Sequence, residues 1–177
     1  MAMTLITTNT SSNAATSDFT SGIDSTYKLY VFKFYDVNPA TDNAEFQFQA
    51  NAAGASGFNE AMTTTFFRAI HDEADSTTGL AYSAAKDQVQ GTSYQSITDN
   101  IGNGGDESCA GILHLFNPSS TTYVKHFYAR ANAYDGADYS FDSYAAGYID
   151  VTSAIDEISF KMDSGNMDAV IKLYGVG

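Results

Sequence analysis

Apolar and polar residues alternate one by one along much of the chain, as they do in β-strands that bury one face. The clearest example is the segment of residues 44–50, AEFQFQA, in which Phe46 and Phe48 alternate with Glu and Gln. Successive strand side chains point to opposite faces of a sheet, so both phenylalanines would face the interior. We predict a strand here with one buried side.

The preceding segment, TYKLYVFKFYDV, has apolar residues on both faces. Tyr30, Phe32 and Phe34 fall on one side of the alternation, and apolar residues also occupy most of the other side. This pattern predicts a central strand, covered on both faces. Residues 38–43, NPATDN, then predict a turn, in which Pro39 ends the strand because it cannot donate to a ladder.

Further strands are predicted wherever Thr, Val, Ile, Phe and Tyr recur in alternation. They cover residues 62–71, 109–116 and 122–134 and two runs at the end of the chain, with short strands at 80–82 and 94–97 inside long loops. No segment has the periodicity of a helix of three turns, although one turn at 152–156 with Ser153 as N-cap fits the pattern. We predict an all-β protein, an antiparallel β-sandwich or jelly roll with long loops.

The two final strands flank a predicted loop at 163–168. If Phe160 lies opposite Ile171, then Ile158 lies opposite Leu173, and every inward residue meets an inward partner. The same matches arise if the two strands lie in opposite sheets and face each other across the core. The pattern is compatible with both arrangements, and in either one we expect the last strand to be part of a sheet.

The beginning of the chain has a different composition. A small apolar patch, Leu5 and Ile6, is followed by about a dozen Thr, Ser, Asn and Ala residues, which pack poorly by themselves. Residues 1–22 are therefore expected to form either an extended arm that reaches a neighbouring subunit or a first strand of the same sandwich. Residues 23–177 are expected to form a single β-sandwich domain.

Charge narrows the choice of partners. The chain has 21 Asp and Glu residues against 8 Lys and Arg, a formal net charge of −13 that repels phosphate backbones and anionic lipid. We therefore expect no nucleic-acid partner and no membrane partner. Charged residues make up only 16% of the chain, so much of the surface is neutral and suited to contact with other proteins. The N-terminus lacks a basic segment followed by a long apolar one, so we expect synthesis in a cytoplasm.

The residue types that commonly take part in catalysis or bind metals show no catalytic pattern here. Cys109 is the only cysteine, which excludes an internal disulfide, and its apolar setting predicts a buried, inert thiol. The three histidines, His71, His114 and His126, lack the short spacing of zinc ligands. The sequence has no Gly-x-Ser-x-Gly elbow and no phosphate-binding loop. We assign no catalytic, cofactor-binding or metal-binding residue and expect the protein not to be an enzyme.

Two acidic loops could suit a hard cation such as calcium, or could simply be solvated. Their oxygen-bearing residues are Asp72, Glu73 and Asp75 in the first, and Asp99, Asn100, Asn103, Asp106 and Glu107 in the second. Neither loop has the spacing of an EF-hand. Sugar binding is weakly disfavoured by the absence of Trp, whose ring is a common platform for sugars.

Three blocks of the sequence resemble a family of small virion structural proteins of tailed bacteriophages, especially phages of cyanobacteria. They are DVNPATDNAEFQFQ (36–49), LHLFNPSSTTYVKHF (113–127), and IDEISFKMDSGN with IKLYGV near the end. The resemblance weakens between residues 72 and 105 and is absent from the N-terminal segment. It implies a β-sandwich or jelly roll that serves as a capsid decoration, or cement, protein or as part of a tail or fibre.

If the resemblance holds, the protein is located in the virion. Its expected partners are the major capsid protein and copies of itself, in a trimer, with no cofactor and no catalytic residue. The alternative is a tail- or fibre-associated protein that binds a host surface glycan or protein. A third interpretation is a carbohydrate-binding module with calcium held in its loops.

Overall fold

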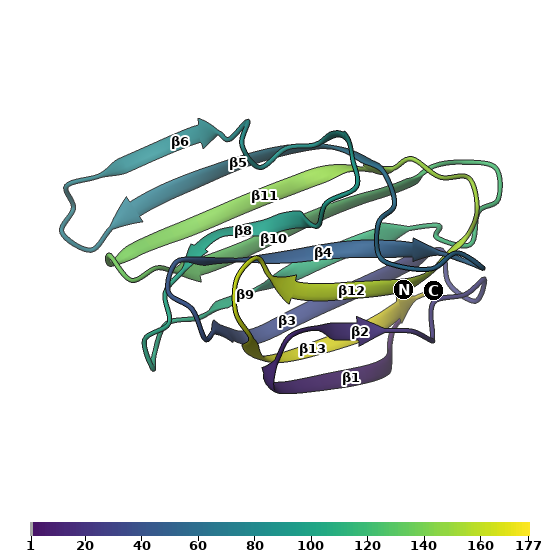
Figure 1. Ribbon diagram of the computed structural model, residues 1–177, viewed down its shortest axis with the longest axis horizontal. Helices are drawn as coiled ribbons and strands as arrows, with labels where there is room; N and C mark the ends of the chain where they lie inside the picture. Colours follow the sequence, from purple (N-terminus) through teal and green to yellow (C-terminus); the bar gives the residue numbers. More distant parts are fainter. Residues whose placement is uncertain (1) are drawn as a thin grey trace.

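The computed structural model describes residues 2–177, and every regular element among them is a β-strand. Thirteen strands form two sheets, one of nine strands and one of four, and all pairings are antiparallel. The sheets lie face to face around a single hydrophobic core (Figure 1). The prediction of an antiparallel all-β sandwich is therefore confirmed.

The nine-stranded sheet is much wider than the sheet that covers it. Its order is β1 (Met3–Ala14), β13 (Met167–Val176), β3 (Leu29–Pro39), β9 (Cys109–Phe116), β10 (Lys125–Tyr134), β11 (Tyr139–Ile149), β5 (Met62–Asp72) and β6 (Thr78–Tyr82), and β7 (Val89–Gly91) also pairs with β5. The four-stranded sheet has the order β2 (Ser17–Phe19), β12 (Ile155–Met162), β4 (Ala44–Ala52) and β8 (Gln95–Ile101).

Most of the predicted strands are confirmed within a few residues. The strand predicted at 44–50 is β4, and both of its phenylalanines are fully buried. The strand predicted to be central is β3, which lies between β13 and β9 and ends at Pro39. Its inward residues Tyr30, Phe32 and Phe34 are at most 1% exposed. Alternation identified these strands because their inward residues are large and apolar.

Strand β11 was not predicted from the sequence. Its buried residues include Ser143 and Ala145 as well as Phe141 and Ile149, so the apolar side of the alternation is weak. A side chain at Gly147 would not fit, because a Cβ there would lie 2.4 Å from the carbonyl oxygen of Thr63 on β5. Small residues let this strand pack closely against β5. They also make the strand only weakly hydrophobic, so the alternation of apolar and polar residues does not identify it.

The turn of helix predicted at 152–156 does not form. Residues 152 and 153 are in a bend, and Ile155 already begins β12. The carbonyl oxygens of Thr152 and Ser153 accept hydrogen bonds from Lys125 Nζ, at 3.1 and 2.7 Å. Because these carbonyls point to the buried lysine, they are not available for the ladder of a helix.

The two final strands lie in opposite sheets, which resolves the alternatives left by the sequence. Phe160 on β12 pairs with Phe48 of the four-stranded sheet, whereas Ile171 on β13 pairs with Phe34 of the nine-stranded sheet. The strands thus face each other across the core. The rings of Phe160 and Phe34 are 5.8 Å apart between centroids.

The N-terminal segment packs on its own sandwich. Strand β1 runs antiparallel to β13 and forms the edge of the nine-stranded sheet, and the two chain ends lie side by side (Figure 1). The chain then crosses to the other sheet as β2. Of the two arrangements expected for this segment, the structure has the strand.

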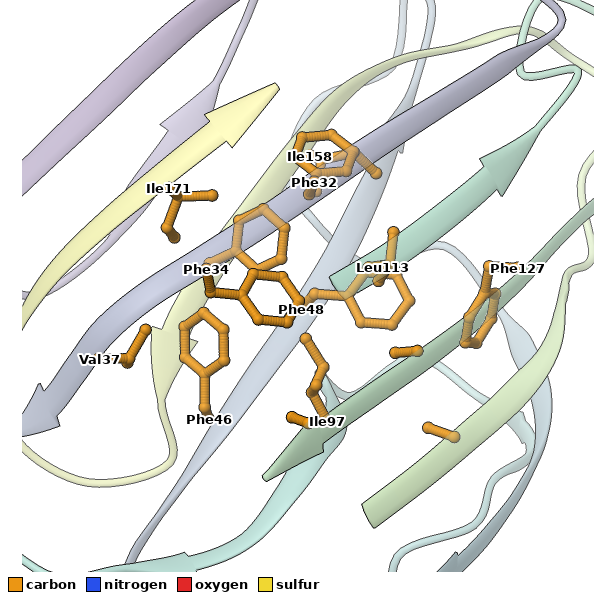
Figure 2. Close-up of a cluster of buried hydrophobic side chains, with 14 of the residues drawn as sticks. Phe32, Phe34, Val37, Phe46, Phe48, Ile97, Leu113, Phe127, Ile158 and Ile171 are labelled. Carbon is orange, nitrogen blue, oxygen red and sulfur yellow. The ribbon is translucent and has the colours of Figure 1, made fainter. Parts of the chain in front are cut away.

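Phenylalanine rings fill the centre of the sandwich. Phe160 is within 5.2 to 5.8 Å of the rings of Phe32, Phe34 and Phe46 between centroids. Figure 2 shows Phe34, Phe46 and Phe48 gathered between the two sheets. Cys109 lies at the margin of this core, 1% exposed, and burial raises the pKa of its thiol far above the usual range. The cysteine is buried as predicted, and an un-ionised thiol is a poor nucleophile.

Candidate functional site

The outer face of the nine-stranded sheet is a broad surface with a distinctive chemistry. Strand β10 illustrates it, since Phe127, Ala129 and Ala131 are buried while His126 and Tyr128 point outward. We call the outward side chains of β3, β5, β9, β10, β11 and β13 the outer platform. Its Phe and Tyr members are Tyr35, Phe67, Phe116, Tyr128, Tyr134, Tyr144, Tyr148 and Tyr174.

One part of the outer platform is an open apolar depression. His114 and Tyr128 are stacked with 4.5 Å between ring centroids, and Phe116 lies 5.7 Å from Tyr128. His126 meets Tyr148 edge to face at 6.2 Å. The depression is lined by Phe116, His126, Tyr128 and Tyr148 together with small residues of β5 and β11. These rings hold one another in place, so a ligand would meet a preformed surface.

A second part of the outer platform combines rings with cations. Phe67 and Tyr144 are stacked with 4.7 Å between centroids, and the Arg130 guanidinium lies 5.0 Å from the Tyr144 ring. Arg130 also donates two hydrogen bonds to Asp142, at 3.0 and 2.8 Å. Arginine and tyrosine in such arrangements are frequent anchors of protein interfaces.

The outer platform is poor in negative charge. Strands β9, β10 and β11 contain one carboxylate between them, Asp142, in a chain with 21 Asp and Glu residues. Arg130 neutralises this carboxylate. Two lysines lie over rings nearby, Lys33 over Tyr174 at 5.4 Å and Lys172 over Tyr35 at 5.3 Å. Strands β3 and β13 add the exposed Asp36 and Asp168, so few of the 21 acidic residues lie on the platform strands.

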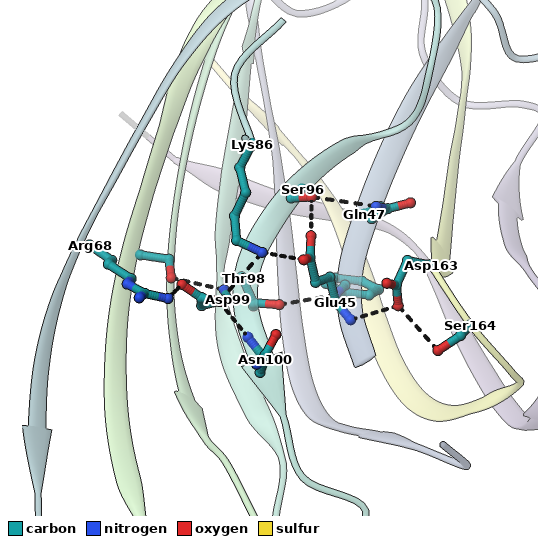
Figure 3. A network of polar contacts seen from close by, with 12 residues as sticks. Glu45, Gln47, Arg68, Lys86, Ser96, Thr98, Asp99, Asn100, Asp163 and Ser164 are labelled. Atoms are coloured by element: carbon teal, nitrogen blue, oxygen red, sulfur yellow. Dashed lines mark hydrogen bonds and ion pairs between the residues drawn. The ribbon is translucent and has the colours of Figure 1, made fainter. Parts of the chain in front are cut away.

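A network of charged side chains runs across the β8 edge of the four-stranded sheet and joins the outer face of β4 to the inner side of β5, opposite the platform (Figure 3). Arg68 of β5 pairs with Asp99 of β8, and Lys86 pairs with Glu45 of β4 and lies 3.4 Å from Asp99. Ser96 donates a hydrogen bond of 2.6 Å to Glu45. Cations and carboxylates match each other here, so the network ties the loop that carries Lys86 to β4 and β8.

This network changes the interpretation of the second acidic loop. Asp99 was a candidate calcium ligand, but its side chain is 3% exposed and faces Arg68 and Lys86. Glu107 of the same loop accepts the backbone N–H of Gly104. Within residues 2–177, no three His, Cys, Asp or Glu side chains come together in a way that could hold a metal ion.

The first acidic loop is organised by its own hydrogen bonds. The Asp72 carboxylate accepts the backbone N–H groups of Ser76 and Thr77, both at 2.8 Å, and also the Ser76 hydroxyl. These bonds favour the charged form and hold the pKa of Asp72 below its ordinary value of 3.8. Asp75 turns away and meets His71, with 3.3 Å between Oδ1 and Nε2.

Asp72→Asn should make the protein less sensitive to acid. A lowered folded-state pKa gives stability that is present above pH 3.8 and is lost as the pH falls through the folded-state value. The variant lacks this titration, so its thermal midpoint should change less than that of the wild type between pH 5 and about pH 2. Circular dichroism melts across this range measure the effect. Asp75→Asn is the matched control, and equal acid slopes for all three proteins would contradict the prediction.

The three histidines have separate environments. His114 is packed between Tyr128 and Phe116, and burial, followed by the nearby Lys33, lowers the pKa of its imidazole. His126 contacts Tyr148, and His71 contacts Asp75. All three lie at outward positions of platform strands, His71 at the end of β5. Sequence reasoning missed this surface, although aromatic residues at the outward positions of β10 and β11 were a visible signal.

Comparisons with other proteins add no assignment. No protein-family model matches the chain, and no curated protein matches it. None of the elements in residues 2–177 is a helix long and apolar enough to cross a membrane.

Proposed function

We propose that the protein is a structural component of a tailed-bacteriophage particle, a capsid decoration protein that binds major capsid subunits. The observation that carries the proposal is the outer platform, a broad, exposed, aromatic surface with little negative charge. The resemblance of the blocks at 36–49 and 113–127 and near the end of the chain supports the same conclusion.

The platform has the composition of a protein-binding surface. Tyr, Phe and Arg are enriched in the centres of interfaces, while Asp, Glu and Lys are depleted there. Tyr128 is 43% exposed and Phe67 is 40% exposed, although both are large and partly apolar. Their strands are paired on both sides, so little conformational entropy is lost when a partner binds. A shell protein can add many such modest contacts over a lattice.

Tyr128→Glu should weaken binding to capsids by about 30-fold, because it places a charge at the centre of the apolar depression. Co-sedimentation with purified particles that lack the protein measures the affinity. Tyr123→Glu is the matched control, since Tyr123 is 70% exposed in the loop before β10. Equal binding by both variants would contradict a role of the platform. Quantitative mass spectrometry of native particles tests the location, with hundreds of copies expected for a decoration protein.

The alternative is a tail- or fibre-associated protein that binds a host glycan, and the apolar depression is the observation that favours it. Flat, exposed rings such as those of Phe116 and Tyr128 can stack against sugar faces. A handful of copies for each particle, together with glycan-array binding that Tyr128→Glu abolishes, would favour this function over decoration. The hydroxyl-bearing loops between residues 72 and 103 would then contribute to host adsorption.

A further inference from the structure

The two sheets have four edges, one of which is shared by β6 and the three-residue β7, and three of these edges are protected against pairing with another chain. β2 has three residues and includes Asp18. β8 is buried at six of its seven positions. β6 has five residues and follows the acidic loop at 72–75, and the Tyr82 hydroxyl at its end is bonded to Asp87. Short length, charge and coverage are the usual means of protecting an edge.

The fourth edge, β1, has none of these protections along its centre. It is 12 residues long and contains neither a charged residue nor a proline. Irregularities in its pairing with β13 occur after Leu5 and after Ser11, which leaves residues 7–11 as a regular strand. Its inner side is held by Asn9, whose amide donates to the carbonyl oxygen of Asp18 at 2.9 Å. Strand β1 is therefore well ordered, and its edge is unprotected against pairing with another chain.

The hydrogen-bond pattern identifies which backbone groups of β1 face outward. Ala2 and Gly177 exchange both backbone hydrogen bonds, at 3.0 and 3.3 Å. Bonded and non-bonded pairs alternate along an antiparallel ladder. Gly177 is at a bonded position of β13, so Lys172 and Val170, an odd number of residues before it, are at non-bonded positions. Their partners on β1 are Thr8 and Thr10. Their N–H and C=O groups point away from β13, to the free edge of the sheet.

We infer that β1 pairs with β1 of a second copy of this chain, antiparallel and about a two-fold axis at Asn9. In this register Thr8 of one copy faces Thr10 of the other, and each pair exchanges both backbone hydrogen bonds. The threonine side chains lie opposite each other on the outer face, a favourable cross-strand pair. The strand is complementary to itself, as a contact across a two-fold axis requires.

Charge favours a second copy at this edge over contact elsewhere. Two molecules with a net charge of −13 each repel one another, but contact through β1 brings no charged side chain of that strand against its counterpart. Salt should therefore strengthen the association by screening the remaining repulsion. The pairing closes both edges and yields a dimer, whereas the resemblance led us to expect a trimer.

The dimer would also matter for capsid binding, although the inference does not depend on the proposed function. A continuous sheet keeps the outward faces of both copies on the same side, so two outer platforms would point in one direction. Two linked binding surfaces gain affinity without any new contact. The free protein is sufficient to test the pairing.

Sedimentation velocity on the full chain over a concentration series tests the inference. The wild type should be a dimer that tightens with added salt. Thr10→Pro removes an outward N–H without touching a bond to β13, and Thr8→Lys/Thr10→Lys places like charges opposite each other. Each variant should raise the dimer dissociation constant by about 30-fold or more. Thr65→Lys, an exposed outward position within the sheet on β5, should leave the dimer unchanged.

Circular dichroism spectra that match the wild type establish that a variant is folded. If Thr10→Pro does not fold, the double lysine variant decides the question. A wild type that is monomeric or trimeric, or a dimer that persists unchanged in a folded edge variant, would overturn the inference. A wild-type dimer that does not bind capsids would count against the decoration role alone.

Discussion

Phe160→Ala is expected to lower the free energy of unfolding by about 4 kcal/mol, since truncation of a buried phenylalanine typically costs about 3 to 5 kcal/mol. Phe160 is fully buried and is within 6.4 Å of the ring centroids of Phe19, Phe32, Phe34, Phe46 and Phe48. Rings from both sheets contact it, so neither sheet can move in alone to close the cavity. Urea denaturation gives the free energy and its m-value.

Phe67→Ala is the matched control for this prediction. Phe67 makes one ring stack, with Tyr144, and is 40% exposed, so its loss should cost about 1 kcal/mol. If the two variants were equally stable, Phe160 would not be central to the packing of the core. An unchanged m-value would indicate that the transition is still two-state.

Lys125→Met is expected to lower the free energy of unfolding by about 3 kcal/mol. The Lys125 ammonium is buried, and its three N–H groups are shared among the carbonyl oxygens of Tyr123, Val151, Thr152 and Ser153, which lie 2.7 to 3.1 Å from Nζ. Methionine retains most of the volume but cannot donate, and a buried acceptor without a partner costs about 1 to 3 kcal/mol. Several carbonyls lose their donor together, although water can reach some of them.

Thermal and urea unfolding measure this cost, and hydrogen exchange should show that the bend at 151–154 becomes less protected. Lys161→Met is the control, because Lys161 is partly exposed and its ammonium lies 4.7 Å from the Tyr94 ring. Its loss should cost less than about 1 kcal/mol. Equal losses in the two lysine variants would mean that the carbonyl cluster contributes little to stability.

The candidate site was only partly accessible to sequence reasoning. Composition alone indicated a surface with few charges and a protein partner. The acidic loops drew attention as cation sites, but in the structure Asp72 caps its own turn and Asp99 pairs with Arg68. Asp99 meets a partner from a distant part of the chain and Asp72 binds its own turn, and in neither case does the spacing to neighbouring acids reveal whether the carboxylate is free.

The outer platform illustrates the same limit. Tyr128 and Tyr144 lie on the outward faces of their strands. Which side chains lie beside them on adjacent strands depends on the pairing register, and the alternation does not give that register. Gly147 and Ala145 weakened the signal of β11, and without β11 the aromatic residues on either side of it would not form one surface.

The sequence by itself determined the β class, the strands with large inward side chains such as those of β3 and β4, and the turn at Pro39. These are local properties, because the alternation of side chains and the dihedral limits of proline act within a few residues. Only the tertiary structure decided that β12 and β13 lie in opposite sheets, that β1 is an edge, and that few of the acids lie on the platform. Each of these depends on which distant strands pair, and that choice follows from the packing of the whole core.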